Sequence, residues 1–453
     1  MVDVKKRFAC ALCALLLAAA LCGDARAEAD APTREALEQQ AHAALEEARY
    51  AACIDAYTEL LTRFPEHQDI AYRNNRALAY AALGRYDEAL IDLYEAEGLD
   101  EENPTVYLNR GDCHFALEDY ASAIADYSRA LVYTNQPWVC LHRIALIYFA
   151  IDDYQAAAQQ LSYAMDWNPQ VPLYHESRGL AYHKLAYYDR SVADYSAAIA
   201  LDPHSAHSYL GRGDSYRAWG KPELALADYL QALTLAPDDA QAHSSYAQML
   251  NDPAQYAQSL AAHDQAIALA PDNALYYARR AQTHAAVAQH ALALADYGQA
   301  LALAPDDAAL FFGRGQAHHA LGLLDEAIAD YQQACALAPK EDAYLLALLP
   351  LYQEGGRLDE AIALYTEAIA HGKYAEKNYS IRGMLYVLHG DYEAGIADLT
   401  VAIRGKSPVP DDFAYRGVAR LRVGLAEQGA ADIARALELD PANAVALAAQ
   451  DAP

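Results

Sequence analysis

The sequence predicts an all-α solenoid, that is, a tandem array of helix hairpins. One unit recurs along the chain, and each copy holds two stretches with apolar side chains at helical spacing, split by a short turn. Prolines such as Pro203, Pro237 and Pro271 stand where the second stretch ends, because a proline excludes its predecessor from the helical region. A small residue marks the unit every 34 residues, at Gly111, Ala145, Gly179, Gly213, Ala247, Ala281 and Gly315.

The first element is a candidate leader. Basic residues Lys5 to Arg7 precede an apolar run of 15 residues from Phe8 to Cys22, and Ala25 to Ala27 forms a small-residue cleavage site. This order is typical of a secretory signal peptide, and we expect cleavage after residue 27. Such a run is shorter than the ~20 residues that span a membrane, so we expect no membrane span.

A lipid anchor through Cys22 is the alternative for the leader. The bulky Leu21 precedes this cysteine, where bacterial lipoprotein signals usually carry a small residue. The expected location is therefore periplasmic or secreted, with a lipid-anchored envelope protein as the alternative.

The repeat array is expected to cover residues 34–443, with a tail of residues 444–453 that is too short for a full capping helix. The small residue continues at Ala41 and Ala77 before the regular run, and at Gly383 and Gly417 after Leu349. Copies are expected to start near residues 34, 70, 104, 138, 172, 206, 240, 274, 308, 342, 376 and 410. Aspartates directly after the prolines, such as Asp238, are expected to cap the next helix.

The unit resembles the tetratricopeptide repeat family. That family has a bulky residue at motif position 4, small residues at 8 and 20, aromatic residues at 11 and 24, and proline at 32. The copy that starts at 206 fills all six positions, with Tyr209, Gly213, Tyr216, Ala225, Tyr229 and Pro237. The resemblance implies a right-handed superhelical solenoid of about twelve hairpins.

Tyrosine is unusually frequent, with 35 residues, but its placement indicates core packing instead of ring stacking on sugars or nucleotides. Twenty-four of these tyrosines fall at motif positions 4, 11, 17 or 24, which are the core sites of the repeat.

Charge and motifs exclude several function classes. The net charge of -29 disfavours nucleic acid and anionic membrane surfaces as partners. No GxSxG, phosphate loop or HExxH motif occurs, and His204, His207, His318 and His319 lack further ligands at zinc-like spacing. We therefore expect no enzyme activity, no metal and no cofactor.

The resemblance implies that protein partners bind in the groove lined by the first helix of each hairpin. The chain has no lysine at motif position 5, which disfavours the subclass that grips a chaperone's C-terminal carboxylate. Two apolar patches on first helices are candidate sites for an extended or helical partner segment, and we expect both to lie outside the hairpin core. They comprise Leu108, Phe115, Leu146 and Phe149 in the first patch, and Ile381, Met384, Val387, Leu388, Val418 and Leu421 in the second.

The patches also allow other interpretations. They could pack against a neighbouring turn of the solenoid or a second copy of the chain, and the C-terminal end is a candidate site of self-association. We predict an exported, non-catalytic scaffold or adaptor. The alternatives are a carrier of small apolar or lipidic ligands in the envelope and an accessory subunit of an envelope enzyme complex.

Two further features concern the array itself. Arginine at motif position 7 and aspartate at position 23 occur together in eight copies, as in Arg212 and Asp228, and both are missing from the other four. We expect an ion pair within each hairpin, with duplication of a three-hairpin block as the rival explanation. Pro350, inside an expected helix, predicts a bend.

Overall fold

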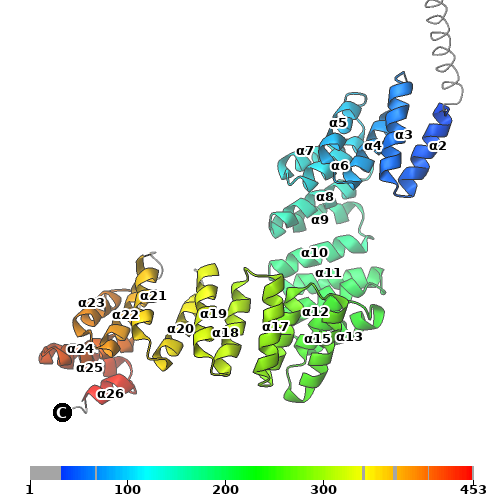
Figure 1. Ribbon diagram of the computed structural model, residues 1–453. Coiled ribbons are helices and arrows are strands. Elements are labelled where there is room, and N and C mark those ends of the chain that lie inside the picture. Colours follow the sequence, from blue (N-terminus) through cyan, green and yellow to red (C-terminus); the bar gives the residue numbers. More distant parts are fainter. Residues whose placement is uncertain (1–31, 67–68, 339–341, 371–374, 407, 451–453) are drawn as a thin grey trace, which may run out of the picture. The chain divides into compact units, whose positions relative to one another are not determined.

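The computed structural model describes residues 32–66, 69–338, 342–370, 375–406 and 408–450. Within these ranges the regular structure is helical and includes no β-strand (Figure 1), which confirms the all-α prediction. The leader and Cys22 lie outside the described residues. None of the described helices has the length and apolar character needed to cross a bilayer.

The chain divides into two compact units, Met1–Leu235 and Ala236–Pro453, which are described separately. In the first unit consecutive helices pack as pairs, beginning with α2 and α3. Its helices are α2 (Arg34–Glu46), α3 (Tyr50–Arg63), α4 (Ile70–Ala82), α5 (Tyr86–Glu97), α6 (Pro104–Ala116), α7 (Tyr120–Tyr133), α8 (Pro137–Ala150), α9 (Tyr154–Trp167), α10 (Pro172–Lys184), α11 (Tyr188–Leu201), α12 (Ala206–Ala218) and α13 (Pro222–Leu235).

The second unit continues the pairing from α14 and α15, with a last helix, α26, after the final pair. Its helices are α14 (Ala240–Met249), the 3₁₀ helix η1 (Pro253–Gln255), α15 (Tyr256–Leu269), α16 (Ala274–Ala286), α17 (His290–Leu303), α18 (Ala308–Ala320), α19 (Leu324–Leu337), α20 (Asp342–Glu354), α21 (Leu358–Ala370), α22 (Ala375–His389), α23 (Tyr392–Ile403), α24 (Pro410–Arg422), α25 (Ala426–Leu439) and α26 (Ala444–Gln450). Helix α20 continues through Pro350. The expected bend stays a prediction.

Turn chemistry fixes the hairpins. In α12–α13 the turn passes through Gly220 at φ +74°, and the Lys221 amide donates to the Tyr216 carbonyl at 2.9 Å, which closes the end of the helix. The helices after Pro237, Pro271 and Pro305 are capped one residue later than predicted, by Asp239, Asn273 and Asp307. Asp239, not Asp238, accepts a hydrogen bond from the Ala242 amide at 2.9 Å, because Pro237 and Asp238 form the preceding turn.

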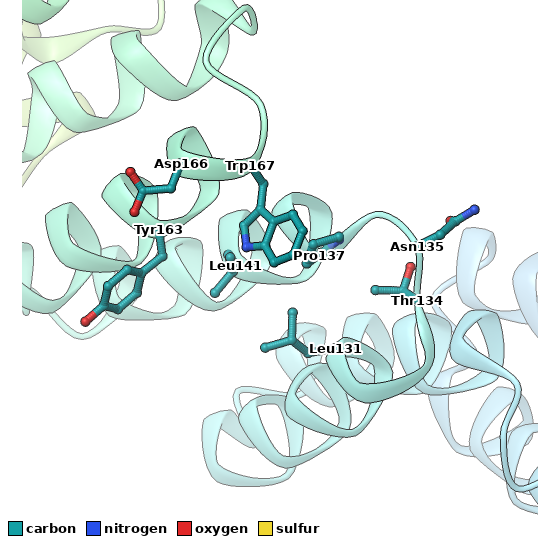
Figure 2. A pocket seen from close by; sticks show the side chains of 8 residues that line it. All are labelled: Leu131, Thr134, Asn135, Pro137, Leu141, Tyr163, Asp166 and Trp167. Atoms are coloured by element: carbon teal, nitrogen blue, oxygen red, sulfur yellow. The ribbon is translucent and has the colours of Figure 1, made fainter.

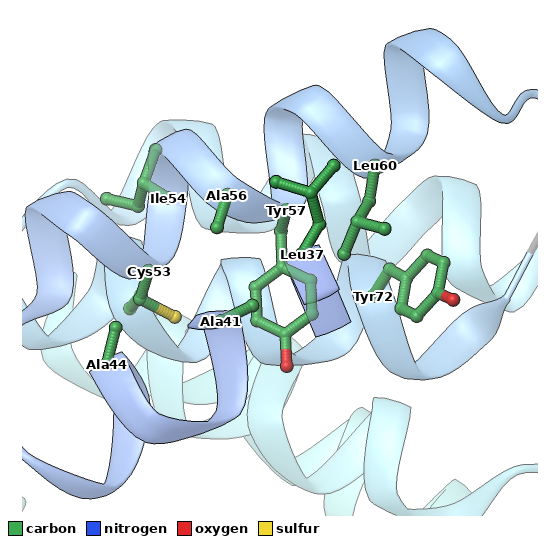
Figure 3. Close-up of a cluster of buried hydrophobic side chains, with 10 residues drawn as sticks. Leu37, Ala41, Ala44, Cys53, Ile54, Ala56, Tyr57, Leu60 and Tyr72 are labelled. Atoms are coloured by element: carbon green, nitrogen blue, oxygen red, sulfur yellow. The ribbon is translucent and has the colours of Figure 1, made fainter. Parts of the chain in front are cut away.

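Buried tyrosines fill the space between helices. Figure 3 shows the cluster of the first hairpin and its neighbour, with Leu37 and Ala41 from α2, Tyr57 and Leu60 from α3, and Tyr72 from α4. All five side chains are at most 4% exposed. This packing supports the assignment of the motif tyrosines to the core.

Glycine at motif position 8 lets a tyrosine at position 24 lie against the first helix. A Cβ added at Gly111 would lie 2.5 Å from Tyr127 Cε1, and one at Gly213 would lie 2.7 Å from Tyr229 Cε1. Such distances are too short for a methyl group, so the ring occupies the place that a larger residue would take.

The predicted pairing of arginine 7 with aspartate 23 is confirmed in all eight copies. Arg212 donates from Nε to Asp228 Oδ2 and from Nη2 to Asp228 Oδ1, both at 2.8 Å. The Asp228 side chain is 8% exposed, and its hydrogen bonds raise the pKa of the Arg212 guanidinium. The same fork joins Arg76–Asp92, Arg110–Asp126, Arg178–Asp194, Arg280–Asp296, Arg314–Asp330, Arg382–Asp398 and Arg416–Asp432.

The remaining nitrogen, Nη1, joins successive hairpins, which sequence reasoning missed. Arg212 Nη1 donates to Ser196 Oγ at 3.1 Å, and that serine lies on the second helix of the preceding hairpin. The equivalent contacts reach motif position 25 of the previous copy in Arg76–Thr58, Arg178–Ser162, Arg280–Asp264, Arg382–Thr366 and Arg416–Thr400. One arginine therefore ties three helices together.

We expect Arg212→Ala and Asp228→Ala to be strongly coupled in a double-mutant cycle followed by urea unfolding. Either single change leaves a partly buried charge without its partner, so the coupling energy should reach ~1 kcal/mol or more. The control cycle combines Arg212→Ala with Asp126→Ala, which lie in different hairpins and should be additive. Additive losses for Arg212 and Asp228 would favour duplication without coupling.

We expect the stability of the second unit to fall in acid because of the buried His263 on α15. Burial lowers its pKa to about 4, and Arg279 and Arg280 add to the effect, while its side chain is 1% exposed. The unfolded chain, with a histidine pKa of about 6.5, binds the proton more readily, so stability is lost as the pH falls from about 6.5 to about 4.

The loss should approach 1.4 kcal/mol per pH unit within that window. His263→Leu should reduce the fall in melting temperature between pH 7 and pH 5, because it removes the imidazole that takes up the proton. Leucine should fit, since Leu93 and Leu161 occupy the same motif position beside an alanine in other copies. An unchanged pH dependence in this variant would contradict the assignment.

Candidate functional site

An open groove lies at the C-terminal end of the second unit. It has a volume of about 1280 Å³ and is lined mainly by apolar side chains of α22, α24, α25 and α26. Four residues of the second predicted patch line it: Val387, Leu388, Val418 and Leu421. We call this feature the C-terminal groove.

The residues of the second patch differ in exposure. Leu388 is 48% exposed and Leu421 38% exposed, so these two leucines present apolar surface to a partner. Met384 and Val418 are half-buried.

The expectation that the second patch lies outside the core is wrong for two residues. Ile381 and Val387 are buried, at 8% and 7% exposure. Ile381 belongs to a cluster with Tyr365 and Leu385, and Val387 packs with Leu399 of α23. Both are therefore primarily core residues, although Val387 also reaches the groove.

The first patch is less open than expected. Leu146 is 40% exposed, while Leu108, Phe115 and Phe149 are half-buried against core clusters. The expectation that Phe115 and Phe149 lie outside the hairpin core is therefore wrong.

The physical reason is a ring contact across each hairpin turn. The Phe115 ring lies 5.9 Å from that of Tyr120, and the Phe149 ring lies 5.9 Å from that of Tyr154. Both tyrosines occupy motif position 17, five residues after the phenylalanine. This recurrence is the sequence signal that could have shown the contact.

The tail forms part of the groove, which sequence reasoning did not predict. Residues 444–450 fold as α26, which packs on α24 and α25 with Ala446 fully buried. The Asn443 side chain accepts from the Ala446 amide at 3.0 Å and donates to Asp411 at 2.6 Å, so it both caps this helix and attaches it to α24. Val445 contributes to the groove wall.

Charges near the groove are mostly paired. Arg416 and Arg420 both donate to Asp432 Oδ2, at 2.9 Å and 2.8 Å, so neither is free to bind a carboxylate strongly. Arg422, which is exposed, lines the groove as well. The arrangement favours an apolar ligand over a strongly charged one.

Metal or thiolate chemistry would rest on the histidine, cysteine and carboxylate side chains of the described ranges. These ranges contain no group of three or more histidine, cysteine, aspartate or glutamate side chains placed to hold a metal ion. Burial raises the pKa of Cys113 to about 12 and that of Cys140 to about 11, which disfavours reactive thiolates at neutral pH.

Curated proteins resemble parts of the array. The human protein named DnaJ homolog subfamily C member 7 is 30% identical over 126 residues, which cover 27% of this chain and 24% of that protein. The Dictyostelium discoideum protein of similar name is 34% identical over 83 residues, which cover 18% and 15%. The matched segments thus span less than a quarter of these relatives.

Solved structures resemble the chain at low identity. A tetratricopeptide repeat protein from Parabacteroides merdae has 18% identity and a TM-score of 0.45, covering 55% of this chain and 98% of that one. The APC/C hetero-tetramer Cut9–Hcn1 has 15% identity and a TM-score of 0.43, covering 92% and 89%.

A family model described as tetratricopeptide repeat matches residues 38–104, 96–137, 177–240 and 278–342, about half of the chain. The matched ranges lie in both units, and all but the first include glycine–tyrosine contacts between helices. The chain belongs to the tetratricopeptide repeat family.

Proposed function

We propose that this chain is a non-catalytic scaffold that binds a protein partner in the C-terminal groove. The observation that carries this proposal is the open apolar groove beside α26. Its exposed leucines, Leu388 and Leu421, come from neighbouring first helices, α22 and α24, which pack on each other. Apolar side chains gathered in one hollow favour a partner that covers them.

The groove's chemistry indicates what the partner presents. Leucine, valine and isoleucine side chains line it, together with the rings of Tyr392 and Tyr415. Such a lining suits a short helix or an extended segment that places several apolar side chains in a row.

A carrier of small apolar ligands is a second candidate, favoured by the size of the groove. Small-molecule sites commonly have volumes of about 300–1000 Å³, so a groove of about 1280 Å³ could hold a lipidic molecule. Native mass spectrometry after gentle purification separates the two, because a carrier would retain additional mass without a protein partner.

The location completes the proposal. The basic, apolar and small-residue order of residues 1–27 supports export to the periplasm or beyond, where the acidic array would serve an envelope assembly. The chain would then act beside its partner, including as an accessory subunit of an enzyme complex.

Replacing Leu388 and Leu421 by serine should weaken partner binding about tenfold or more while leaving helical circular dichroism nearly unchanged. The reason is that Leu388 is 48% and Leu421 38% exposed, so their loss costs contact area with the partner and less core packing than the loss of a buried leucine. In-cell cross-linking with mass spectrometry would identify the partner, and titration of its purified segment would give the affinity.

Leu439→Ser is the matched control, because Leu439 is 44% exposed on α25 and does not line the groove. It should bind the partner like the unchanged protein. Equal binding by the Leu388→Ser/Leu421→Ser variant would exclude the groove as the partner site.

We further expect the exported protein to begin at Glu28. Cleavage after Ala27 would remove the basic and apolar leader, and N-terminal sequencing of the protein recovered from the periplasm or medium checks this. A start at Cys22 together with incorporation of labelled fatty acid would instead establish the lipid anchor.

A further inference from the structure

A second hollow lies in the first unit. It has a volume of about 400 Å³ and is formed where α7 ends, α8 begins and α9 ends. Figure 2 shows the Trp167 ring extending from the end of α9 toward Pro137 and Leu131, with Tyr163 and Asp166 on the other side. We call it the α9 hollow.

The aromatic residues here depart from the repeat. Tyr163 and Trp167 stand at motif positions 26 and 30 of their hairpin, where the next hairpin has Ala197 and Leu201. A spacing of four residues places both on one face of α9. Trp167 is 65% exposed and Tyr163 46%, and exposed aromatic rings of this kind are typical of binding sites.

The surroundings of the rings are negative. Asp166 is exposed at the hollow, and no ion pair of its carboxylate occurs in the part of the chain that the structure describes. The helices α7 and α9 both end here while α8 begins here, so one negative helix end is left uncompensated and adds to its charge. The acidic chain, with a net charge of -29, adds a long-range attraction for cations.

Arg178 is engaged by another carboxylate. It donates two hydrogen bonds to Asp194 at 2.8 Å, which raise its pKa most, and one to Ser162, while the Asp166 charge raises this pKa least. An external cation is therefore the complementary partner.

We propose that the α9 hollow binds a lysine or arginine side chain of a protein partner. The aliphatic stem would lie against Leu131, Leu141 and Pro137, and the charged head would lie against the Trp167 ring, with the carboxylate of the adjacent Asp166 adding negative charge. The chain offers an internal example of the chemistry, because Lys221 Nζ lies 3.2 Å from the centroid of the Trp219 ring. The hollow is large enough for one long side chain.

The test uses the full chain labelled with 5-fluorotryptophan. The chain has three tryptophans, which give three fluorine resonances. The Trp167 resonance is assigned by its loss in Trp167→Leu. Tetralysine should shift this resonance saturably, whereas tetraglutamate and fully acetylated tetralysine should not. The Trp219 resonance is the internal control, since Lys221 already covers its ring.

Two variants separate a specific site from general attraction to an acidic protein. Each of the variants Trp167→Leu and Asp166→Asn should weaken tetralysine binding about fivefold or more. Binding to Trp167→Leu is measured by calorimetry, because this variant lacks the Trp167 resonance. Leucine occupies the same motif position in Leu201 and Leu235, so Trp167→Leu should keep the fold, which circular dichroism checks. Affinity for tetralysine that is unchanged in both variants would overturn the proposal.

Two other outcomes also overturn it. A Trp167 shift with choline but not with tetralysine would assign the hollow to quaternary ammonium groups, including lipid head groups. A shift with cellobiose alone would assign it to sugars. Because the readout concerns α9, the C-terminal groove variants should leave it unchanged, and failure of either proposal can be recognised independently.

Discussion

In the eight copies that carry it, the arginine at motif position 7 makes the ionic contact on which the packing of the hairpin depends. Its Nε and Nη2 hold the aspartate of the second helix, and in most cases its Nη1 reaches back to the preceding hairpin, as Arg212 does with Asp228 and Ser196. Removing such an arginine would leave a nearly buried carboxylate without its counter-charge and would break the link between hairpins. Packing of glycine against tyrosine then completes a hairpin whose register the fork already fixes.

The sequence was sufficient for the fork within a hairpin but not for the link between hairpins. Arginine and aspartate occur together, so their contact could be predicted, whereas the Nη1 partner varies among Thr58, Ser162 and Asp264. In the copy before Arg314 the same position is Gly298, which has no side chain to accept. Because the accepting group can be a hydroxyl or a carboxylate, or can be absent, the sequence shows no regular pattern at this position.

The candidate site was predictable only in part, for a similar reason. The second patch lies on α22 and α24, and four of its residues, Val387, Leu388, Val418 and Leu421, line the groove. The burial of Ile381 and the folding of α26 depend on tertiary contacts, such as the hydrogen bond from Asn443 to Asp411. Helical periodicity shows which side chains share a face, but not which faces a later segment covers.

The α9 hollow lies where the repeat loses its fork. The copy that starts at 138 has Ile144 at motif position 7, and the preceding copy has Ser128 at position 25, so no arginine joins this pair of positions. Leu141 lies one turn before Ile144 on α8, and Leu131 lies one turn after Ser128 on α7; both line the hollow. In a regular array the recurring residues pack the hairpins together. Residues that depart from the repeat are therefore the ones that can make one part of the array recognise a particular partner. Trp167, in place of the leucine found in the two following copies, is such a residue.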